Sequence, residues 1–121
     1  MNNLLLVFLG GGIGSLLRYG IGIAVQSTVK TGFPLATLCS NVISCIVLAF
    51  TVLLLNQKLM LQPNLKMFVL VGFCGGLSTF STFSFETVEL MKTGNTLMAI
   101  ANIVLSVTVC IGLIYFLVKH V

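Results

Sequence analysis

Long uncharged stretches dominate the pattern of polar and apolar positions along the chain. Residues 1–17, 31–57, 67–85 and 93–118 contain no Asp, Glu, Lys or Arg. A helix needs about 20 mostly apolar residues to cross the hydrocarbon core of a bilayer. Spanning strands are disfavoured because these stretches are continuously apolar, whereas a barrel strand alternates over about ten residues. The pattern therefore predicts four transmembrane helices, at about residues 4–25, 34–55, 66–86 and 96–118.

The composition supports an integral membrane protein. Hydrophobic residues make up 58% of the 121 positions and charged residues 7%, with a mean hydropathy of +1.19. A typical soluble domain contains about 25% charged residues, and a soluble fold of this size is too small to bury so much apolar surface. We therefore expect one all-α membrane domain over residues 1–121. Because no basic residue precedes Leu4 and no small-residue cleavage site follows, we expect the first span to be retained.

The basic residues give almost no orientation signal. An excess of Lys and Arg normally marks the cytoplasmic loops. With four spans, the lysines divide three to two between the sides: Lys58, Lys66 and Lys119 against Lys30 and Lys92. Two interpretations fit this balance: chance in a chain with few charges, or dual topology, in which copies insert both ways and pair antiparallel. The net charge of +4 is too scattered for a nucleic-acid surface.

The residue types that support catalysis or metal binding are poorly placed. The single histidine is His120, next to the C-terminus, and the two carboxylates, Glu86 and Glu89, fall at the far end of the third predicted span. The cysteines lie in three different spans and match no zinc spacing, so we interpret them as small apolar filler: Cys39, Cys45, Cys74 and Cys110. We expect no enzyme activity.

The first span carries small residues and one arginine. Small residues four positions apart let helix backbones approach closely, and this span has three such pairs: Gly10 with Gly14, Gly11 with Ser15, and Gly20 with Ala24. Arg18 lies roughly 20 Å along the span, at about 1.5 Å per residue. Two orientations are open to its guanidinium. It faces protein or a water-filled cavity, which implies a function, or it extends to the headgroups.

Two further spans carry polar side chains on one face. The offsets of 0, 4 and 7 in the second span, and of 0, 4 and 8 in the fourth, follow the helical repeat. Hydrogen bonding between helices is one interpretation of these stripes. A polar path for a solute that cannot enter bare hydrocarbon is the other. The residues are Thr37, Asn41 and Ser44 in the second span, and Asn102, Ser106 and Cys110 in the fourth.

The third span contains GFCGGLSTFSTFSFE, residues 72–86, in which glycines, hydroxyl residues and phenylalanines alternate. A transmembrane helix breaks only where protein or water satisfies the freed backbone groups. Gly75-Gly76 is the expected breaking point, with Ser and Thr hydroxyls able to bond the amides. A break exposes carbonyls that bind cations and amides that bind anions. Phe80 and Phe83 share a face, so an anion can contact their positive ring edges, although ordinary packing also accounts for such a pair.

At these residues the sequence resembles the Fluc (CrcB-type) fluoride channels. Besides the third-span stretch, two blocks are similar to that family: GGGIGSLLRYG in the first span and PLATLCSN in the second. The resemblance implies a dual-topology antiparallel homodimer in the bacterial cell membrane, with two pores that let fluoride leave the cytoplasm passively and so lower its toxicity. Some relatives work as obligate pairs of two different chains, which leaves the homodimer open.

The resemblance also implies a set of site residues. A central structural Na⁺ would be held by backbone carbonyls of Gly75 and Ser78 from both subunits. Ser78 stands where the family more often has Thr, which leaves a carbonyl unaffected, and Ala36 stands where Gly is usual, which alters packing at the start of the second span. Arg18 and Glu86 match further motif positions. The residues expected along the fluoride pathway are Asn41, Phe80, Phe83, Ser81, Thr82, Thr37, Ser106 and Asn102.

Two other classes of membrane protein are also considered. Small multidrug or cation antiporters have four spans and are often of dual topology, but they depend on a carboxylate in the first span, where this chain has only Arg18. A non-conducting assembly subunit would need neither the polar stripes nor the phenylalanine pair. The fluoride channel is therefore the leading hypothesis.

Overall fold

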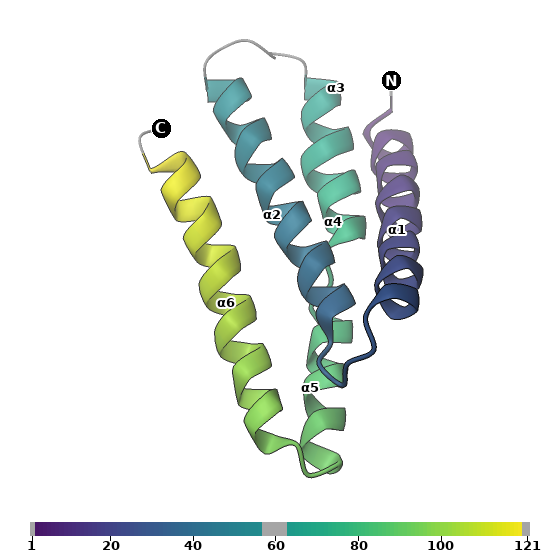
Figure 1. The fold of residues 1–121 in the computed structure, drawn as a ribbon. Helices are drawn as coiled ribbons and strands as arrows, with labels where there is room; N and C mark the ends of the chain where they lie inside the picture. Colours follow the sequence, from purple (N-terminus) through teal and green to yellow (C-terminus); the bar gives the residue numbers. More distant parts are fainter. Residues whose placement is uncertain (1, 57–62, 120–121) are drawn as a thin grey trace.

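The computed structural model describes residues 2–56 and 63–119, which form helices joined by short connections (Figure 1). Four stretches are long and apolar enough to cross a membrane: Asn3–Thr28, Leu35–Leu54, Pro63–Lys92 and Thr96–Val118. The prediction of an all-α protein with four spans is confirmed. In chain order the elements are α1 (Asn3–Thr28), α2 (Leu35–Asn56), α3 (Pro63–Lys66), η1 (Met67–Phe73, a π-helix), α4 (Cys74–Leu77), α5 (Ser81–Lys92) and α6 (Thr96–Val118).

The third span is longer than the predicted residues 66–86. It begins at Pro63 because proline suits the first position of a helix, where an N–H has no intrahelical partner. At the other end, Glu86 and Glu89 do not stop α5, since glutamate is a good helix former. The first charge after an apolar stretch therefore marked the edge of the apolar segment and not the end of the helix.

A glycine turn ends α5. Gly94 has a φ of +85°, the left-handed conformation that glycine adopts without a steric penalty. The Asn95 N–H donates to the Leu90 carbonyl at 2.8 Å, and the Gly94 N–H donates to the Met91 carbonyl at 3.2 Å. These two bonds form a Schellman motif, which satisfies carbonyls left over at the helix end. Gly94 and Asn95 therefore form the turn that joins α5 to α6.

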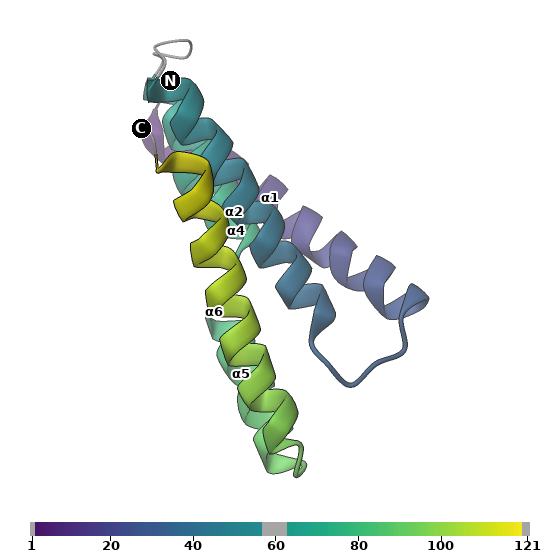
Figure 2. The ribbon, with the colours of Figure 1, turned by 60° about the vertical axis from the view of Figure 1, so that its left-hand side comes forward.

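The third span contacts different neighbours along its length. The helix α1 packs against η1 and α4, the first half of the span, while α6 packs against α5 and α2. In both views α5 and α6 run side by side, and α1 and α6 lie on either side of α2 (Figures 1 and 2). The non-helical residues 78–80 separate the two halves of the span.

Glycine backbones make the contact between α1 and the first half of the third span. A Cβ added to Gly14 would overlap the Phe73 carbonyl, and one added to Gly76 would overlap the Gly11 carbonyl. Gly10 is enclosed in the same way. The predicted close approach is therefore confirmed for the pair Gly10 and Gly14, and no larger residue fits at these positions without moving a backbone.

Other small residues of α1 do not take part in this contact. A Cβ on Gly12 or Gly20 would meet no atom within 4 Å in the described part of the chain. Ser15 and Ala24 are also exposed. Spacing alone predicted three packed pairs, but only one face of α1 meets the third span.

Most apolar side chains of the spans are not buried within the chain. Depending on the span, 17% to 28% of its apolar window is buried. Large hydrophobic residues on α1 and α6 are largely exposed, for example Phe8 and Leu97. In a membrane protein this surface faces lipid or a neighbouring subunit.

Candidate functional site

The third span is interrupted three residues later than the sequence predicted. Gly75 and Gly76 are both helical, within α4, and the backbone becomes extended at Ser78, with φ −82° and ψ 156°. Helical conformation resumes at Ser81. The prediction that the glycine pair forms the break is therefore wrong. Gly76 lies against the backbone of Gly11, within the helical α4.

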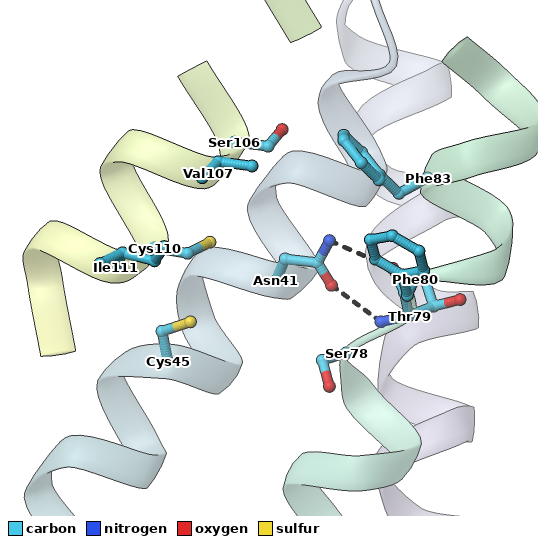
Figure 3. A pocket seen from close by; sticks show the side chains of 10 residues that line it. All are labelled: Asn41, Cys45, Ser78, Thr79, Phe80, Phe83, Ser106, Val107, Cys110 and Ile111. Carbon is cyan, nitrogen blue, oxygen red and sulfur yellow. Dashed lines mark hydrogen bonds between the residues drawn. The ribbon is translucent and has the colours of Figure 1, made fainter. Parts of the chain in front are cut away.

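Asn41 of α2 supports the interruption through its carboxamide. Its Oδ1 accepts a hydrogen bond from the Thr79 N–H at 2.8 Å, and its Nδ2 donates to the Thr79 carbonyl at 3.3 Å (Figure 3). The Thr79 hydroxyl in turn accepts from the Thr82 N–H at 3.2 Å. Side chains thus replace backbone partners where the helix stops, as is required of broken helices inside a membrane.

These bonds leave two carbonyls without their helical donors. In a continuous helix the Gly75 carbonyl would accept from the Thr79 N–H, and the Ser78 carbonyl from the Thr82 N–H. Both N–H groups donate instead to side-chain oxygens, those of Asn41 and Thr79. The carbonyls freed in this way are the two that the family resemblance assigns to a sodium ion.

Two neighbouring carbonyls, those of Gly76 and Cys74, are engaged by side chains. The Arg18 Nε donates to the Gly76 carbonyl at 3.1 Å, so its guanidinium faces protein and not the headgroups. The Cys74 carbonyl accepts from the Ser44 hydroxyl at 3.0 Å and from the Ser78 hydroxyl at 2.8 Å. Of the two orientations considered for Arg18, the structure therefore shows the protein-facing one. The guanidinium lies beside the end of α4.

A pocket of about 300 Å³ opens beside the interruption, between α2, α5 and α6 (Figure 3). Five residues predicted for the site meet there from separate elements: Asn41, Ser78, Phe80, Phe83 and Ser106. No Asp, Glu, Lys, Arg or His occurs among the described lining residues. The others that line the pocket are Thr79, Cys45, Val107, Cys110 and Ile111.

The two phenylalanines differ in their surroundings. Their ring centroids are 5.8 Å apart and their planes are tilted by 44°. Phe83 is 9% exposed and belongs to the core, whereas Phe80 is 78% exposed. A single chain therefore covers one ring and leaves the other open on the pocket side.

A chain of buried polar side chains connects α6 to α5 next to the pocket. The Ser106 hydroxyl donates to Asn102 Oδ1 at 3.3 Å, and Asn102 Nδ2 donates to the Thr87 hydroxyl oxygen at 2.9 Å. The Thr87 hydroxyl donates to the Phe83 carbonyl at 2.8 Å. Asn102 therefore bridges two helices and does not line the pocket.

The remaining predicted residues lie around the pocket without lining it. Thr37 is buried on α2, one turn before Asn41. Ser81 is exposed, with its hydroxyl 3.4 Å from the Thr79 hydroxyl. Glu86 has one carboxylate oxygen, Oε1, that is buried with no hydrogen-bond partner in the described residues. Their roles in a pathway stay predictions.

Sequence reasoning missed two features of the site. Thr87 was not singled out, although it follows Phe83 by four positions and so shares its helical face. Cys45 was interpreted only as filler, yet it lines the pocket together with Cys110, which the polar stripe of the fourth span already included. The available signal was positional, because Cys45 follows Asn41 by four residues.

Comparison with known proteins identifies the family of the chain. A family model described as "CrcB-like protein, Camphor Resistance (CrcB)" matches residues 5–118. The chain belongs to the CrcB-like family. Among CrcB-like relatives, the "Fluoride-specific ion channel FluC" of Shewanella halifaxensis is 42% identical over 115 residues, covering 95% of this chain and 92% of the relative. The protein of the same name from Shewanella piezotolerans is 44% identical with the same coverage. The family resemblance seen in the motifs is confirmed.

Proposed function

We propose that this chain is a subunit of a fluoride-selective channel, through which fluoride leaves the cytoplasm passively and its toxicity falls. The observation that carries the proposal is the pocket at the interruption, where amide and hydroxyl groups meet two aromatic rings and no charged side chain lines the described wall. Relatives named as fluoride channels, at 42% and 44% identity, support the same activity.

The lining suits a small, strongly hydrated anion. Such an ion needs donors to replace its water, but it must also leave again, so binding has to stay weak and distributed over several sites. Asn41 Nδ2 carries two N–H groups, and one of them bonds the Thr79 carbonyl. The second N–H, the Ser106 hydroxyl and the positive ring edges of Phe80 and Phe83 can contact an anion in succession. None of these groups carries a full charge.

The proposed channel is an antiparallel dimer with two pores. Phe80 is exposed in the single chain, and Gly75 is exposed beside the interruption, so both are open to contact with a second subunit. The near-even division of lysines agrees with insertion in both orientations. Two copies of this chain are the simplest assembly, and a related second chain is the alternative.

A tag at the C-terminus should be accessible from both sides of one membrane, and labelling from one side only in a conducting sample would contradict dual topology.

Backbone carbonyls of Gly75 and Ser78 are the proposed sodium ligands. Sodium binds oxygen ligands, and the supporting observation is that both carbonyls have lost their helical donors to the side chains of Asn41 and Thr79. The ion would supply a positive charge that neutralises carbonyl dipoles meeting at the dimer centre. Side chains of the protein satisfy the neighbouring carbonyls: Arg18 donates a hydrogen bond to the Gly76 carbonyl, and Ser44 donates one to the Cys74 carbonyl.

A multidrug-type antiporter is the weaker alternative. That activity depends on a carboxylate at the transport site, and no Asp or Glu lines the described wall of the pocket. The two carboxylates of α5, Glu86 and Glu89, lie outside the lining. We therefore retain the channel.

Fluoride efflux from liposomes that contain only this protein tests the proposal. Vesicles loaded with potassium fluoride are diluted into fluoride-free buffer, and a fluoride electrode records release when valinomycin supplies the counter-current. We expect rapid fluoride release, with chloride-loaded vesicles as the matched control releasing far less. Protein-containing vesicles that release no more fluoride than empty ones would contradict a channel made of this chain alone. Recovery on adding a related chain would indicate the heterodimer.

A further inference from the structure

The hydrogen-bond chain from Ser106 to Phe83 has a defined direction. Its last acceptor is a backbone carbonyl, that of Phe83, which cannot donate. The Thr87 hydroxyl must therefore give its only proton to that carbonyl and can only accept from Asn102. The Asn102 carboxamide must then present its NH₂ group to Thr87, as observed at 2.9 Å.

This direction determines what Ser106 offers to the pocket. Because the Asn102 NH₂ group faces Thr87, its Oδ1 faces Ser106 and accepts the Ser106 proton at 3.3 Å. In Figure 3 the Ser106 oxygen points away from Asn41. A hydroxyl has one proton and two lone pairs. With its proton bonded to Asn102, Ser106 presents lone pairs, and these repel an anion.

The surroundings allow no easy substitute for this bond. Asn102 is 1% exposed, while Thr87 and Ser106 are each 6% exposed. Water therefore has little access to Asn102 Oδ1, and leaving a buried acceptor without a partner is unfavourable. Rotating the Ser106 hydroxyl toward an anion costs the bond to Asn102.

We infer that Asn102 competes with the transported anion for the Ser106 proton, and that Thr87 sets this competition by fixing the orientation of the Asn102 carboxamide. The inference rests on the proposed function and deepens it. Asn102 is then a positioning residue that weakens anion binding at Ser106, and not a ligand of the ion. Weak binding at this point favours release along the path.

Three variants test the competition through the fluoride concentration at half-maximal current in planar bilayers. Asn102→Leu removes the competing acceptor, and Thr87→Val lets the carboxamide turn. Each should lower the half-maximal fluoride concentration by roughly fivefold. This is the change in affinity expected when an anion gains one hydrogen bond of typical net strength. Thr87→Ser keeps the hydroxyl and is the matched control, with a wild-type half-maximal concentration.

The Ser106→Ala background separates competition from general loosening of the helices. In Ser106→Ala, Asn102→Leu should leave the half-maximal fluoride concentration unchanged, because the Ser106 hydroxyl proton is no longer present. The effects of the two substitutions are therefore expected to be non-additive. Size-exclusion profiles confirm that each variant is assembled. If Asn102→Leu and Thr87→Val are assembled and have the wild-type half-maximal concentration, the inference is wrong while the proposed channel stands. Absence of fluoride current in the wild-type protein would remove the proposed function itself, and the inference with it.

Discussion

The two halves of the third span are held in different ways. The first half, η1 and α4, meets α1 through glycines, with backbone lying on backbone. The second half, α5, meets α6 through the side chains of Thr87 and Asn102. A backbone contact excludes any added atom, whereas a side-chain contact can be tuned by changing one donor or acceptor. The interruption lies where one kind of contact gives way to the other, and the pocket lies at the same place.

Adjacent glycines show the same contrast on a smaller scale. A Cβ on Gly76 would overlap the Gly11 carbonyl, whereas a Cβ on Gly75 would meet no atom within 4 Å in the described part of the chain. Packing inside the subunit therefore accounts for Gly76 but not for Gly75. The reason for a glycine at position 75 is expected outside the single chain, in the assembled channel.

The largest effect is expected from filling the backbone contact. Gly14→Val should prevent assembly, because the added carbons overlap the Phe73 carbonyl. Overpacking a well-packed site costs about 1–3 kcal/mol, and we expect at least the upper end where a backbone is struck. Size exclusion in detergent and thermal unfolding measure the loss. Gly12→Val on the same helix is the matched control, since a Cβ there meets open space. Equal stability of both variants would refute the backbone contact.

The next effect separates packing within a subunit from packing between subunits. Gly75→Val should leave the subunit helical but abolish the assembled channel. The added Cβ meets no atom of the described chain within 4 Å, so the bulk of the β-branched side chain would fall on the proposed contact with the second subunit. Ser78→Thr should conduct like the wild type, since the proposed sodium ligand is its backbone. Circular dichroism, size exclusion and liposome efflux distinguish these outcomes. Unchanged flux in Gly75→Val, or after thorough removal of Na⁺, would count against a structural sodium ion.

A charge placed at the interruption should block conduction. Asn41→Asp keeps an acceptor for the Thr79 N–H but brings a negative charge to the pocket. At about 4 Å and an effective dielectric near 20, repulsion of fluoride is about 4 kcal/mol, or roughly a thousandfold in occupancy. Asn41→Ala, which adds no charge, is the control and should lose stability through the unmet backbone groups of Thr79, by about 1–3 kcal/mol. Fluoride flux at neutral pH near the wild-type level in Asn41→Asp would place the path elsewhere.

The smallest of these effects distinguishes a ring-edge path from packing. Phe80→Leu and Phe83→Leu should assemble yet lose at least about tenfold in fluoride flux, about 1.4 kcal/mol, because leucine has no positive edge. Phe80 is the sharper test, since it is 78% exposed and contributes little to the core. The corresponding methionine variants should keep partial flux, because a thioether is polarizable and of similar volume. If both leucine variants conduct like the wild type, the rings serve packing alone.

Features that depend on chain-local chemistry followed from the sequence. Bilayer thickness sets the length of an apolar span, so four spans could be counted directly. The turn at Gly94-Asn95 follows from glycine's access to positive φ. Asn41, Phe80, Phe83 and Ser106 could be singled out as candidates, because an amide, a hydroxyl and aromatic rings stand out against an apolar background, and the structure brings them to one pocket. Their part in a fluoride pathway stays a prediction.

The position at which the third helix is interrupted depends on contacts between helices, which the sequence pattern does not contain. Glycine permits a break without requiring one, and Gly76 is helical where it packs on Gly11. The interruption begins at Ser78, and Asn41, 38 residues before Thr79 in sequence, offers the Thr79 N–H a different acceptor. The orientation of Arg18 and the pairing of Thr87 with Asn102 are long-range in the same sense. A local pattern states which groups need partners, but the partners come from other helices, and only packing brings them within hydrogen-bonding distance.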